Sequence, residues 1–320
     1  MKIVVLDGHA LNPGDLTWAG FEKFGEVTVY DRTSYTDKKE IVERIGQAEV
    51  VLTNKIPIDE EILAQTPQVN YIGVTATGFN IIELAAAKKY GVTVTNIPAY
   101  GTDAVAQFTF ALLLELTSQV GLHSASVHDG DWQTSPDFTY WKTPLMELAG
   151  KTIGLIGYGA IAQAVAEIAH AFKLNVIYYN HRTKTPQAKW AKQVTLAELY
   201  AQADIVSLHV PQTKETVGMI DEAAIAQMKA GVLLLNTARG GLLNEAAVAQ
   251  ALNTGKIAGA GLDVVAKEPI AADNPLLMAK NCFLTPHIAW APVETRSRLL
   301  QIAVDNLASY LQGETKNVVS

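Results

Sequence analysis

A glycine-rich turn in the middle of the chain has the residue types and the spacing of a loop that binds a dinucleotide. It reads Gly157-Tyr158-Gly159-Ala160-Ile161-Ala162, in the pattern G-x-G-x-x-A, and joins the apolar run 152–156 to a helical pattern. Gly157 permits a tight turn, Gly159 lets backbone N–H groups approach the phosphates, and Ala162 allows close packing of helix on strand. Protein kinases contain a similar glycine-rich sequence pattern, but no kinase catalytic-loop motif follows in this chain. The segment therefore favours a nucleotide site over a purely structural turn.

The segment about 20 residues after the glycines selects the dinucleotide in such folds, because an acid there binds the ribose hydroxyls of NAD. In this chain the segment reads Asn180-His181-Arg182-Thr183-Lys184 and contains no carboxylate. Arg182 would attract the 2′-phosphate of NADP, which an acid would repel. The sequence therefore predicts NAD or NADP as the cofactor, with NADP preferred. Asn180 still permits a hydrogen bond to the ribose of NAD, and a solvated basic loop is the remaining alternative.

A second set of polar residues stands at the ends of apolar runs further along the chain. His209, Arg239, Asp263 and His287 each follow such a run, and Glu268 comes five residues after Asp263. Ligands of doubly wound folds bind at the carboxyl ends of the strands, so these residues are better candidates than polar residues elsewhere. Taken singly, each also fits a helix cap, a solvated loop residue or a hydrogen-bonded core residue.

The elements that must position these residues alternate between short apolar runs and helical patterns, which predicts βαβ units and parallel sheets. The expected strands are 2–7, 26–30, 50–53, 71–74, 92–95, 152–156, 176–179, 205–209, 232–236, 259–264 and 283–284. The expected helices are 14–24, 38–48, 59–65, 81–90, 104–117, 196–202, 222–229, 245–253 and 293–311, besides the one after the glycine turn. We expect helix 104–117 to be buried between two lobes, where Gln107 is either a satisfied core amide or a group that points into the cleft. Residues 128–150 are expected to form a loop.

The composition narrows the class of protein. With 320 residues, of which 49% are hydrophobic and 18% charged, the chain is expected to form two domains with sizeable cores. A net charge of −7 argues against a nucleic-acid partner. The apolar run 108–116 is too short to span a membrane, and the first strand leaves no room for a signal peptide. The single cysteine, Cys282, is expected to be buried and fits a reducing compartment, so a cytoplasmic location is predicted.

Two other classes of enzyme chemistry are disfavoured by the motifs that the sequence lacks. The histidines show no pair with the spacing of metal ligands, so no metal site is expected. A serine nucleophile would sit in a G-x-S-x-G turn, which does not occur.

Three motifs in order, together with the glycine turn, closely resemble the D-isomer-specific 2-hydroxyacid dehydrogenases. They are residues 236–241 (Asn-Thr-Ala-Arg-Gly-Gly), 262–269 (Leu-Asp-Val-Val-Ala-Lys-Glu-Pro) and 285–289 (Thr-Pro-His-Ile-Ala). The likeness extends to 75–80 and 96–107 and covers nearly the whole chain. It implies two doubly wound parallel-sheet α/β domains with a cleft between them, usually in a homodimer. A flavodoxin-like substrate-binding domain would comprise 1–99 and 291–320, and a Rossmann dinucleotide-binding domain 100–290.

The resemblance also implies roles for the strand-end residues. Arg239 would bind the substrate carboxylate and polarise the keto oxygen, and His287 would be the acid/base. Glu268 would hydrogen-bond His287, fixing its orientation and favouring the imidazolium form. Backbone N–H groups would hold the other side of the carboxylate, from Ala76, Thr77 and Gly78. One departure is Gln107, where many relatives carry Glu; turnover is not expected to be abolished.

The cofactor is expected to contact both the glycine turn and the later strand ends. The implied set is Thr102, Gly157, Tyr158, Gly159, Ala160, Ile161, Asn180, His181, Arg182, His209, Val210, Pro211, Thr216, Thr237, Ala238, Asp263 and His287. Within it, Asp263 and Thr102 would lie on the nicotinamide side.

The segments 51–55, 137–141 and 287–290 look like the glycerate dehydrogenase/hydroxypyruvate reductase branch, which favours hydroxypyruvate or glyoxylate as substrate. Lys55, Trp141 and Trp290 would then bind substrate, with Trp141 reaching the neighbouring subunit's site; an exposed loop aromatic is the alternative. Lys55 and Arg296 could assist in binding the carboxylate, and solvated surface charges are an almost equally good interpretation of both. Phosphoglycerate is disfavoured, because no regulatory module follows His287. The other functions left open are a non-catalytic NAD(H)-sensing protein on the same scaffold and the same chemistry on another 2-keto acid such as pyruvate.

Overall fold

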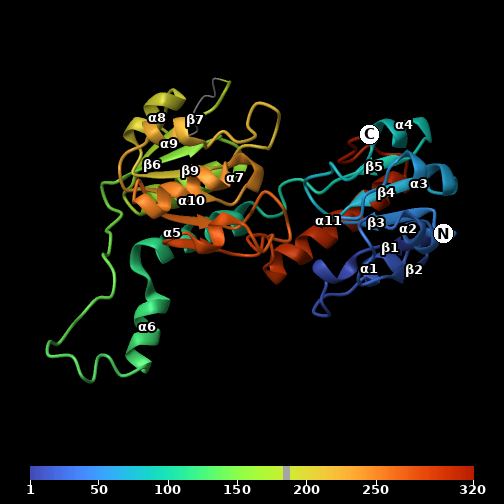
Figure 1. Cartoon of the computed structure of the whole chain (residues 1–320). Helices are drawn as coiled ribbons and strands as arrows, with labels where there is room; N and C mark the ends of the chain where they lie inside the picture. The colour runs from blue at the N-terminus through green and yellow to red at the C-terminus, as the bar shows by residue number, and fades with distance from the viewer. Residues whose placement is uncertain (183–187) are drawn as a thin grey trace. The chain divides into compact units, whose positions relative to one another are not determined.

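The computed structural model describes residues 1–182 and 188–320, and the chain divides into two compact units (Figure 1). Unit 1 contains Met1–Gly101 and Trp290–Ser320, and unit 2 contains Thr102–Ala289. The chain passes from one unit to the other after Gly101 and again after Ala289. The sequence predicts these boundaries after residues 99 and 290.

Unit 1 is built on a parallel sheet with the strand order β2-β1-β3-β4-β5. The strands are β1 (Lys2–Val5), β2 (Glu26–Val29), β3 (Val50–Thr53), β4 (Tyr71–Val74) and β5 (Thr93–Thr95). The helices are η1 (Gly8–Ala10), α1 (Ala19–Glu22), α2 (Lys38–Ile45), α3 (Glu60–Gln65), α4 (Leu84–Lys89) and α11 (Val293–Leu311). This is the flavodoxin-like strand order. The order in which strands are added reverses between β1 and β3, and ligands of such folds bind there, at the carboxyl ends of the strands.

Helix α11 returns to unit 1 because its apolar stripe packs on that unit's sheet. Leu299, Val304 and Leu307 are buried against Ile3 and Phe21. At the start of the helix Arg296 is buried and forms a bidentate ion pair with Asp15, at 2.7 and 2.6 Å. The guanidinium also donates to the carbonyls of Leu11 and Ala291. Arg296 is therefore a buried anchor of this helix, and not the solvated surface charge that the sequence allowed.

The first predicted helix, 14–24, is much shorter in the structure, where only α1 forms. The Asn12 side chain accepts hydrogen bonds from the N–H groups of Gly14 and Leu16 and donates to the carbonyl of Leu16. Asparagine side chains that bond to nearby backbone compete with helix formation. The segment before Trp18 is therefore a loop fixed by Asn12.

Unit 2 is built on a second parallel sheet, with the order β12-β11-β10-β9-β6-β7-β8 in the described residues. The strands are β6 (Thr152–Ile156), β7 (Asn175–Tyr179), β8 (Ala191–Gln193), β9 (Ile205–Leu208), β10 (Val232–Asn236), β11 (Ile257–Leu262) and β12 (Cys282–Leu284). The helices are α5 (Thr102–Ser118), α6 (Val120–His128), α7 (Ala160–Ala171), α8 (Leu196–Gln202), α9 (Glu222–Gln227), α10 (Glu245–Thr254), η2 (Gly240–Leu242) and η3 (Pro275–Met278). From β8 to β11 the order is that of a Rossmann fold, which confirms the predicted fold class.

Helix α5 packs on the sheet of unit 2. A Cβ added to Gly259 or Gly261 of β11 would lie 2.7 Å from Leu116 or 2.9 Å from Leu112, so these glycines permit the close approach of the helix. The predicted burial of this helix is thus supplied by the sheet of unit 2. Gln107 lies on its exposed side, which removes the interpretation as a core amide.

The sequence did not predict α6 or β8. β8 has only three residues, Ala-Lys-Gln, and so carries no apolar run. α6 leaves Val120, Leu122 and Val127 exposed and therefore lacks the one-sided apolar pattern of a helix on a core. In residues 1–182 and 188–320 no single helix is long and apolar enough to cross a membrane; α5 and α6 meet that test only when taken together, across a bend of 54°.

Candidate active site

The glycine turn has the geometry that a pyrophosphate requires. Gly157 has φ +95°, and a Cβ there would lie 2.6 Å from the carbonyl oxygen of His209. Gly159 is the N-cap of α7, and no atom lies within 4 Å of the position that its Cβ would occupy. The first N–H groups of α7 have no partner within the helix and carry the positive end of its dipole. The open space over Gly159 therefore faces donors that suit phosphate oxygens.

Tyr158, within this turn, is 3% exposed, and its ring stacks on Tyr178 of β7 with the centroids 3.8 Å apart. Its side chain belongs to the core, so only its backbone is available to a cofactor. Ala160 and Ile161 follow in the first turn of α7, and Ala162 is fully buried where the helix meets the sheet.

The loop after β7 is organised by Asn180. The Asn180 side chain donates a hydrogen bond of 2.8 Å to the carbonyl of Arg182, and Gln193 donates to the carbonyl of Asn180. His181 and Arg182 are exposed. Thr183 and Lys184, which the sequence places in the same segment, lie outside the described residues. The described part of the loop thus presents an amide and a guanidinium.

His209 follows β9 and is held beneath the glycine turn. Its Nε2 lies 2.9 Å from the hydroxyl of Ser207, and burial lowers the pKa of the imidazole to about 4. The ring is therefore neutral near pH 7. Val210 and Pro211 continue the chain, and the Thr216 hydroxyl donates to the carbonyl of Pro211 at 2.7 Å, which closes the following loop.

Glu268 and His287 come together from the ends of two neighbouring strands, β11 and β12. Nδ1 of His287 lies 2.8 Å from Oε2 of Glu268, and the other oxygen of Glu268 accepts from the N–H of Val265. His287 has φ +56°, in the left-handed region, where a non-glycine residue is uncommon. Among the described residues, Nε2 of His287 has no hydrogen-bond partner. The carboxylate thus orients the ring so that Nε2 is the nitrogen left for a ligand.

Arg239 stands at the end of β10, beside the segment that carries Glu268. A Cβ on Gly240 would lie 1.9 Å from the carbonyl carbon of Val265, so these two loops touch. The fully buried Asn236 donates to the carbonyl of Arg239 at 2.9 Å and accepts from the N–H of Ala238 at 3.0 Å. Arg239 is exposed and donates to the carbonyl of Ala238. Its guanidinium therefore retains further donors on a fixed backbone.

Asp263 is 1% exposed and holds the His287 loop in place. Its carboxylate accepts from the Thr285 hydroxyl at 2.6 Å, from the N–H of Ile288 at 2.9 Å and from the N–H of Ala289 at 2.8 Å. The sequence predicts a cofactor contact for Asp263 but does not indicate its hydrogen bonds to the loop that carries His287. Two other predicted cofactor residues lie on α5 and directly after β10. Thr102 begins α5, and Thr237 shares a 3.0 Å hydroxyl contact with Thr109.

In unit 1 a buried aspartate fixes the loop that carries Lys55. Asp7 is 8% exposed, and its carboxylate accepts from the N–H groups of Asn54 at 2.8 Å and Lys55 at 2.6 Å. Burial raises the pKa of Asp7, against the lowering effect of those hydrogen bonds. The Asn54 side chain in turn donates to the carbonyl of Thr75 at 2.9 Å. Asp7 follows the first apolar run directly, so the strand-end criterion used for Asp263 would have found it.

The loop at 75–78 presents a row of backbone donors. The carbonyls of Thr75, Ala76 and Thr77 accept from the Asn54 side chain, the Ile97 N–H and the Asn96 side chain. In a planar trans peptide the N–H of the next residue points away from the carbonyl. Each N–H of Ala76, Thr77 and Gly78 therefore points away from the partner of the preceding carbonyl, and among the described residues none of the three has a hydrogen-bond acceptor. Three adjacent donors of this kind suit a carboxylate.

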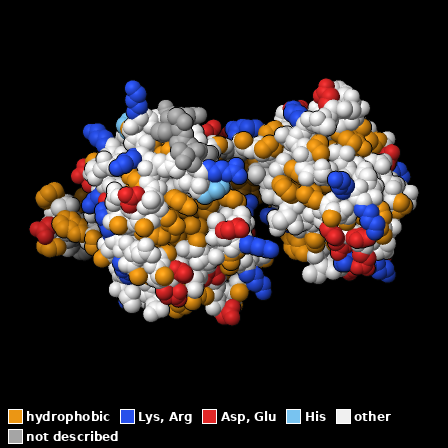
Figure 2. Space-filling model, turned by 90° about the horizontal axis from the view of Figure 1, so that it is seen from above, with side chains coloured by type: hydrophobic (Ala, Val, Ile, Leu, Met, Phe, Trp, Pro, Cys, Tyr) orange, Lys and Arg blue, Asp and Glu red, His pale blue; other side chains and the backbone are white. Residues whose placement is uncertain are grey.

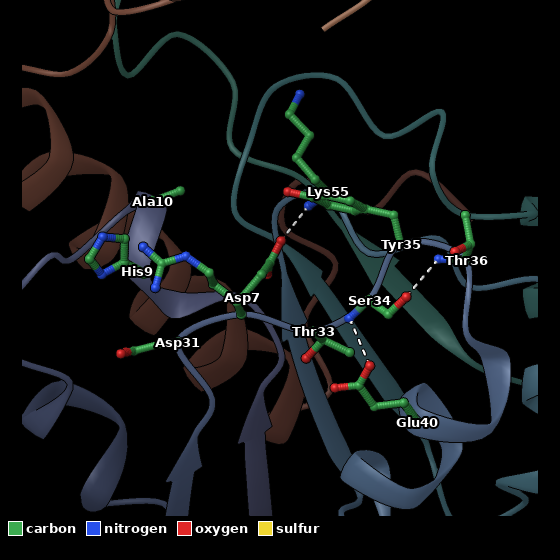
Figure 3. Close-up of a pocket in the computed structure, with 11 residues that line it drawn as sticks. Asp7, His9, Ala10, Asp31, Thr33, Ser34, Tyr35, Thr36, Glu40 and Lys55 are labelled. Carbon is green, nitrogen blue, oxygen red and sulfur yellow. Dashed lines mark hydrogen bonds between the residues drawn. The ribbon is translucent and has the colours of Figure 1, made fainter. Parts of the chain in front are cut away.

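A cavity of about 580 Å³ lies at the carboxyl ends of β1, β2 and β3 in unit 1 (Figure 3). Figure 3 shows the Asp7 carboxylate turned to the Lys55 backbone, while the Lys55 side chain extends away from it. Glu40, also in the lining, pairs with Arg44 and accepts from the N–H of Ser34 at 3.1 Å. Two of the acidic groups in this cavity are thus engaged by the protein itself.

The two tryptophans predicted to bind substrate have different environments. Trp290 is half-buried and packs on the core of unit 1, next to α11. Trp141 is 67% exposed, in an arm formed by α6 and residues 129–150. The arm extends from the sheet of unit 2 (Figure 1), and apolar side chains cover the part that projects beyond that unit (Figure 2). The tip is braced by a 3.0 Å hydrogen bond from Trp132 to the carbonyl of Phe138 and by an ion pair between Lys142 and Asp131.

The described residues contain no group of three His, Cys, Asp or Glu side chains arranged to hold a metal ion. Cys282 is half-buried, and burial raises the pKa of its thiol to about 11, so it is not a reactive thiolate near pH 7.

Residues 110–289 match the family model described as D-isomer specific 2-hydroxyacid dehydrogenase, NAD binding domain. The chain belongs to this family. A hydroxypyruvate reductase of Blautia hydrogenotrophica is 50% identical over 321 residues, covering 100% of both chains. A glycerate dehydrogenase of Methylorubrum extorquens is 39% identical over 320 residues, covering 99% of this chain and 98% of that protein.

Solved structures of D-2-hydroxyacid dehydrogenase relatives also match over the whole chain. A D-lactate dehydrogenase from Lactobacillus jensenii with NAD⁺ has a TM-score of 0.82 at 30% identity, covering 100% of both chains. An acyclic imino acid reductase with NADPH and D-Arg has a TM-score of 0.85 at 31% identity, with the same coverage. This D-2-hydroxyacid dehydrogenase is therefore an oxidoreductase of 2-keto and 2-hydroxy acids that uses a nicotinamide cofactor. The named relatives are enzymes, which disfavours the alternative of a non-catalytic sensor.

The depressed pKa of His209 makes the stability of unit 2 depend on pH. Between about pH 6.5 and pH 4 the unfolded chain binds a proton at this residue and the folded protein does not, so stability falls as the pH falls. We expect a loss of at most about 3 kcal/mol over this window. Denaturant unfolding at pH 7 and pH 5 should show a smaller loss for His209→Asn than for the wild type. His128→Asn, at the end of the exposed α6, is the control, and an equal pH dependence in all three proteins would contradict the assignment.

Proposed function

We propose that the enzyme reduces a small 2-keto acid, hydroxypyruvate or glyoxylate first, to the corresponding D-2-hydroxy acid. The observation that carries this proposal is the His287–Glu268 pair, whose atoms lie 2.8 Å apart. Its two residues follow β12 and β11, and β11 pairs with β10, the strand that Arg239 follows. The relatives named hydroxypyruvate reductase and glycerate dehydrogenase support the substrate.

Glu268 and His287 supply the proton. With Nδ1–H donating to the carboxylate of Glu268, the imidazolium form carries its transferable proton on Nε2. In the reductive direction Nε2 gives this proton to the keto oxygen, and in the oxidative direction it takes the hydroxyl proton back. A nicotinamide cofactor held at the glycine turn would supply the hydride for the keto carbon.

Arg239 and the 76–78 loop bind the substrate carboxylate. A guanidinium pairs with a carboxylate through two parallel N–H donors, which also orients the adjacent keto group. The N–H groups of Ala76, Thr77 and Gly78 offer further donors. Lys55, whose backbone is fixed by Asp7, and Trp290 complete the proposed substrate contacts in unit 1.

For the cofactor we propose NADPH in preference to NADH. The first turn of α7, with Gly157 and Gly159, would hold the pyrophosphate. Arg182 is exposed beside Asn180, and no acid stands in the described part of this loop to repel a 2′-phosphate. His209, Val210, Pro211, Thr216, Thr237, Ala238, Asp263 and Thr102 remain the other proposed cofactor contacts.

We further propose a homodimer joined through the arm. Phe138 is 89% exposed and Trp132 and Leu145 are also exposed, which is an unusual concentration of apolar surface on a projecting segment. The partner's copy of the arm would place Trp141 at the substrate, as the sequence predicts.

A panel of 2-keto acids tests the reaction. With NADPH or NADH, the wild type should oxidise the cofactor with hydroxypyruvate or glyoxylate at higher kcat/KM than with pyruvate. His287→Asn should lower kcat at least about a hundredfold, because it removes the general acid, and should leave cofactor affinity nearly unchanged. His170→Asn, at the exposed last turn of α7, serves as the control. Absence of turnover with every acid, while the cofactor still binds, would contradict the proposed function, and unaltered kcat in His287→Asn would contradict its role.

Two substitutions test the cofactor preference. Arg182→Ala should raise KM for NADPH about tenfold, because a charge-assisted hydrogen bond is lost, and should leave KM for NADH nearly unchanged. Asn180→Asp should shift the preference towards NADH. Lys192→Ala, an exposed basic residue on β8, is the matched control. If the wild type prefers NADH, or if Arg182→Ala affects both cofactors alike, the proposal is wrong.

A charge on the arm tests the dimer. Phe138→Asp should convert the protein to a species with the mass of one chain, 34.5 kDa, by light scattering after gel filtration. Met278→Asp, equally exposed but on η3, should leave the mass unchanged. A wild type that already has the mass of one chain would exclude the dimer.

A further inference from the structure

Three asparagines in unit 1 connect the C-terminal tail to the loop of Thr77. The side chain of Asn317 donates from Nδ2 to Oδ1 of Asn306 at 2.8 Å. Nδ2 of Asn306 donates to the carbonyl of Asn96 at 3.0 Å, and Nδ2 of Asn96 donates to the carbonyl of Thr77 at 2.8 Å. All three amides therefore donate in one direction, from the tail towards the loop.

The direction of these hydrogen bonds is fixed by burial. Asn306 is 1% exposed and Asn96 9%, so an amide that lost its partner there would bear the full cost of its desolvation. Turning over the Asn306 amide would place its oxygen against the carbonyl oxygen of Asn96. Its NH₂ group would then face the side-chain NH₂ group of Asn317. No flip of this amide restores both bonds.

The tail is itself tied to the edge of the sheet. The N–H of Val319 donates to the carbonyl of Val94 at 2.8 Å, and the N–H of Val94 donates to the hydroxyl of Ser320 at 3.2 Å. The N–H of Asn96 donates back to the carbonyl of Asn317 at 3.1 Å. Asn317 is thereby held beside β5 in a left-handed conformation, with φ +54°.

We propose that Asn306 and Asn317 are positioning residues for substrate binding, which act through Asn96 on the Thr77–Gly78 peptide. This inference rests on the proposed function, in which the 76–78 N–H groups bind the substrate carboxylate. The Thr77 carbonyl and the Gly78 N–H lie in one peptide plane and point in opposite directions. Anchoring the carbonyl on Asn96 therefore aims the Gly78 N–H.

Of the other two peptides of the loop, only that of Thr75 is held independently of the tail, because the Ile97 N–H that binds the Ala76 carbonyl shares a peptide with the Asn96 carbonyl that accepts from Asn306. The carbonyl of Thr75 accepts from Asn54, and that of Ala76 from the N–H of Ile97. Loss of the tail contacts is thus expected to loosen the N–H groups of Gly78 and Thr77 and to leave that of Ala76 fixed. The effect should be a moderate weakening of carboxylate binding, without loss of the reaction.

Two variants of the full-length protein separate this role from general stability. Asn317→Gly removes the amide, and glycine adopts the positive φ without strain. Asn306→Asp keeps the oxygen that accepts from Asn317 and replaces the donor to Asn96 with a second oxygen. Each should raise KM for the keto acid roughly fivefold, the worth of one hydrogen bond, with kcat and KM for the cofactor nearly unchanged. Asn12→Gly is the control, because that side chain fixes a different loop of the same unit.

Hydrogen exchange gives a second measurement that does not depend on activity. In both variants the peptide that contains 76–78 should exchange faster than in the wild type, while peptides of unit 2 should not change. Unaltered keto-acid KM and unaltered exchange at 76–78 would overturn the proposal. Equal rises in the KM values for keto acid and cofactor would overturn it too, since they indicate general loosening. A wild type that reduces no keto acid would instead count against the proposed function, and the exchange at 76–78 would still decide whether the tail orders this loop.

Discussion

A strand in the middle of a parallel sheet cannot shift along its axis without breaking hydrogen bonds on both sides and packing on both faces. β10 and β11 are such strands: they are bonded on both edges and buried. The residues directly after their carboxyl ends are therefore held in fixed positions. Arg239 and Glu268 follow these two strands, and His287 follows β12 beside them. The precision of the proposed acid–base pair thus derives from the rigidity of the sheet.

The two units use the same device to extend that rigidity into loops. In each, a buried aspartate just after one strand accepts backbone N–H groups from the loop after the neighbouring strand. Asp7, after β1, holds the loop after β3, and Asp263, after β11, holds the loop after β12. Each carboxylate is satisfied by donors that a flexible loop would otherwise offer to water, which offsets the cost of burying it. Lys55 and His287 both stand on loops that are fixed in this way.

Sequence patterns predicted the alternating α/β architecture, the strands that carry the site and the full extent of α8 and α11, because apolar periodicity reports burial directly. They failed where periodicity carries no such information. α6 has exposed apolar residues, and β8, Ala-Lys-Gln, contains no apolar run. The first half of the helix expected at 14–24 is displaced by the side-chain hydrogen bonds of Asn12. Candidate site residues were nominated by their place at strand ends and by motif, but of their hydrogen bonds only the one between Glu268 and His287 was predicted, from the resemblance to the family. Tyr158 packs in the core and Asn96 supports the 76–78 loop. Both facts depend on contacts between segments that are distant in the sequence, which no local pattern encodes.

The discontinuity of unit 1 has a consequence for how the chain is made. Unit 2 is one continuous stretch, so all of its strands have been synthesised once Ala289 has been added. Unit 1 begins first but still lacks α11 and the residues that cover the edge of β5, and its buried face on Leu299 and Leu307 stays open until they arrive. Since domains fold as units during synthesis, the later-starting nucleotide half is complete before the half that starts the chain. The N-terminal sheet therefore keeps one apolar face uncovered until α11 has been synthesised.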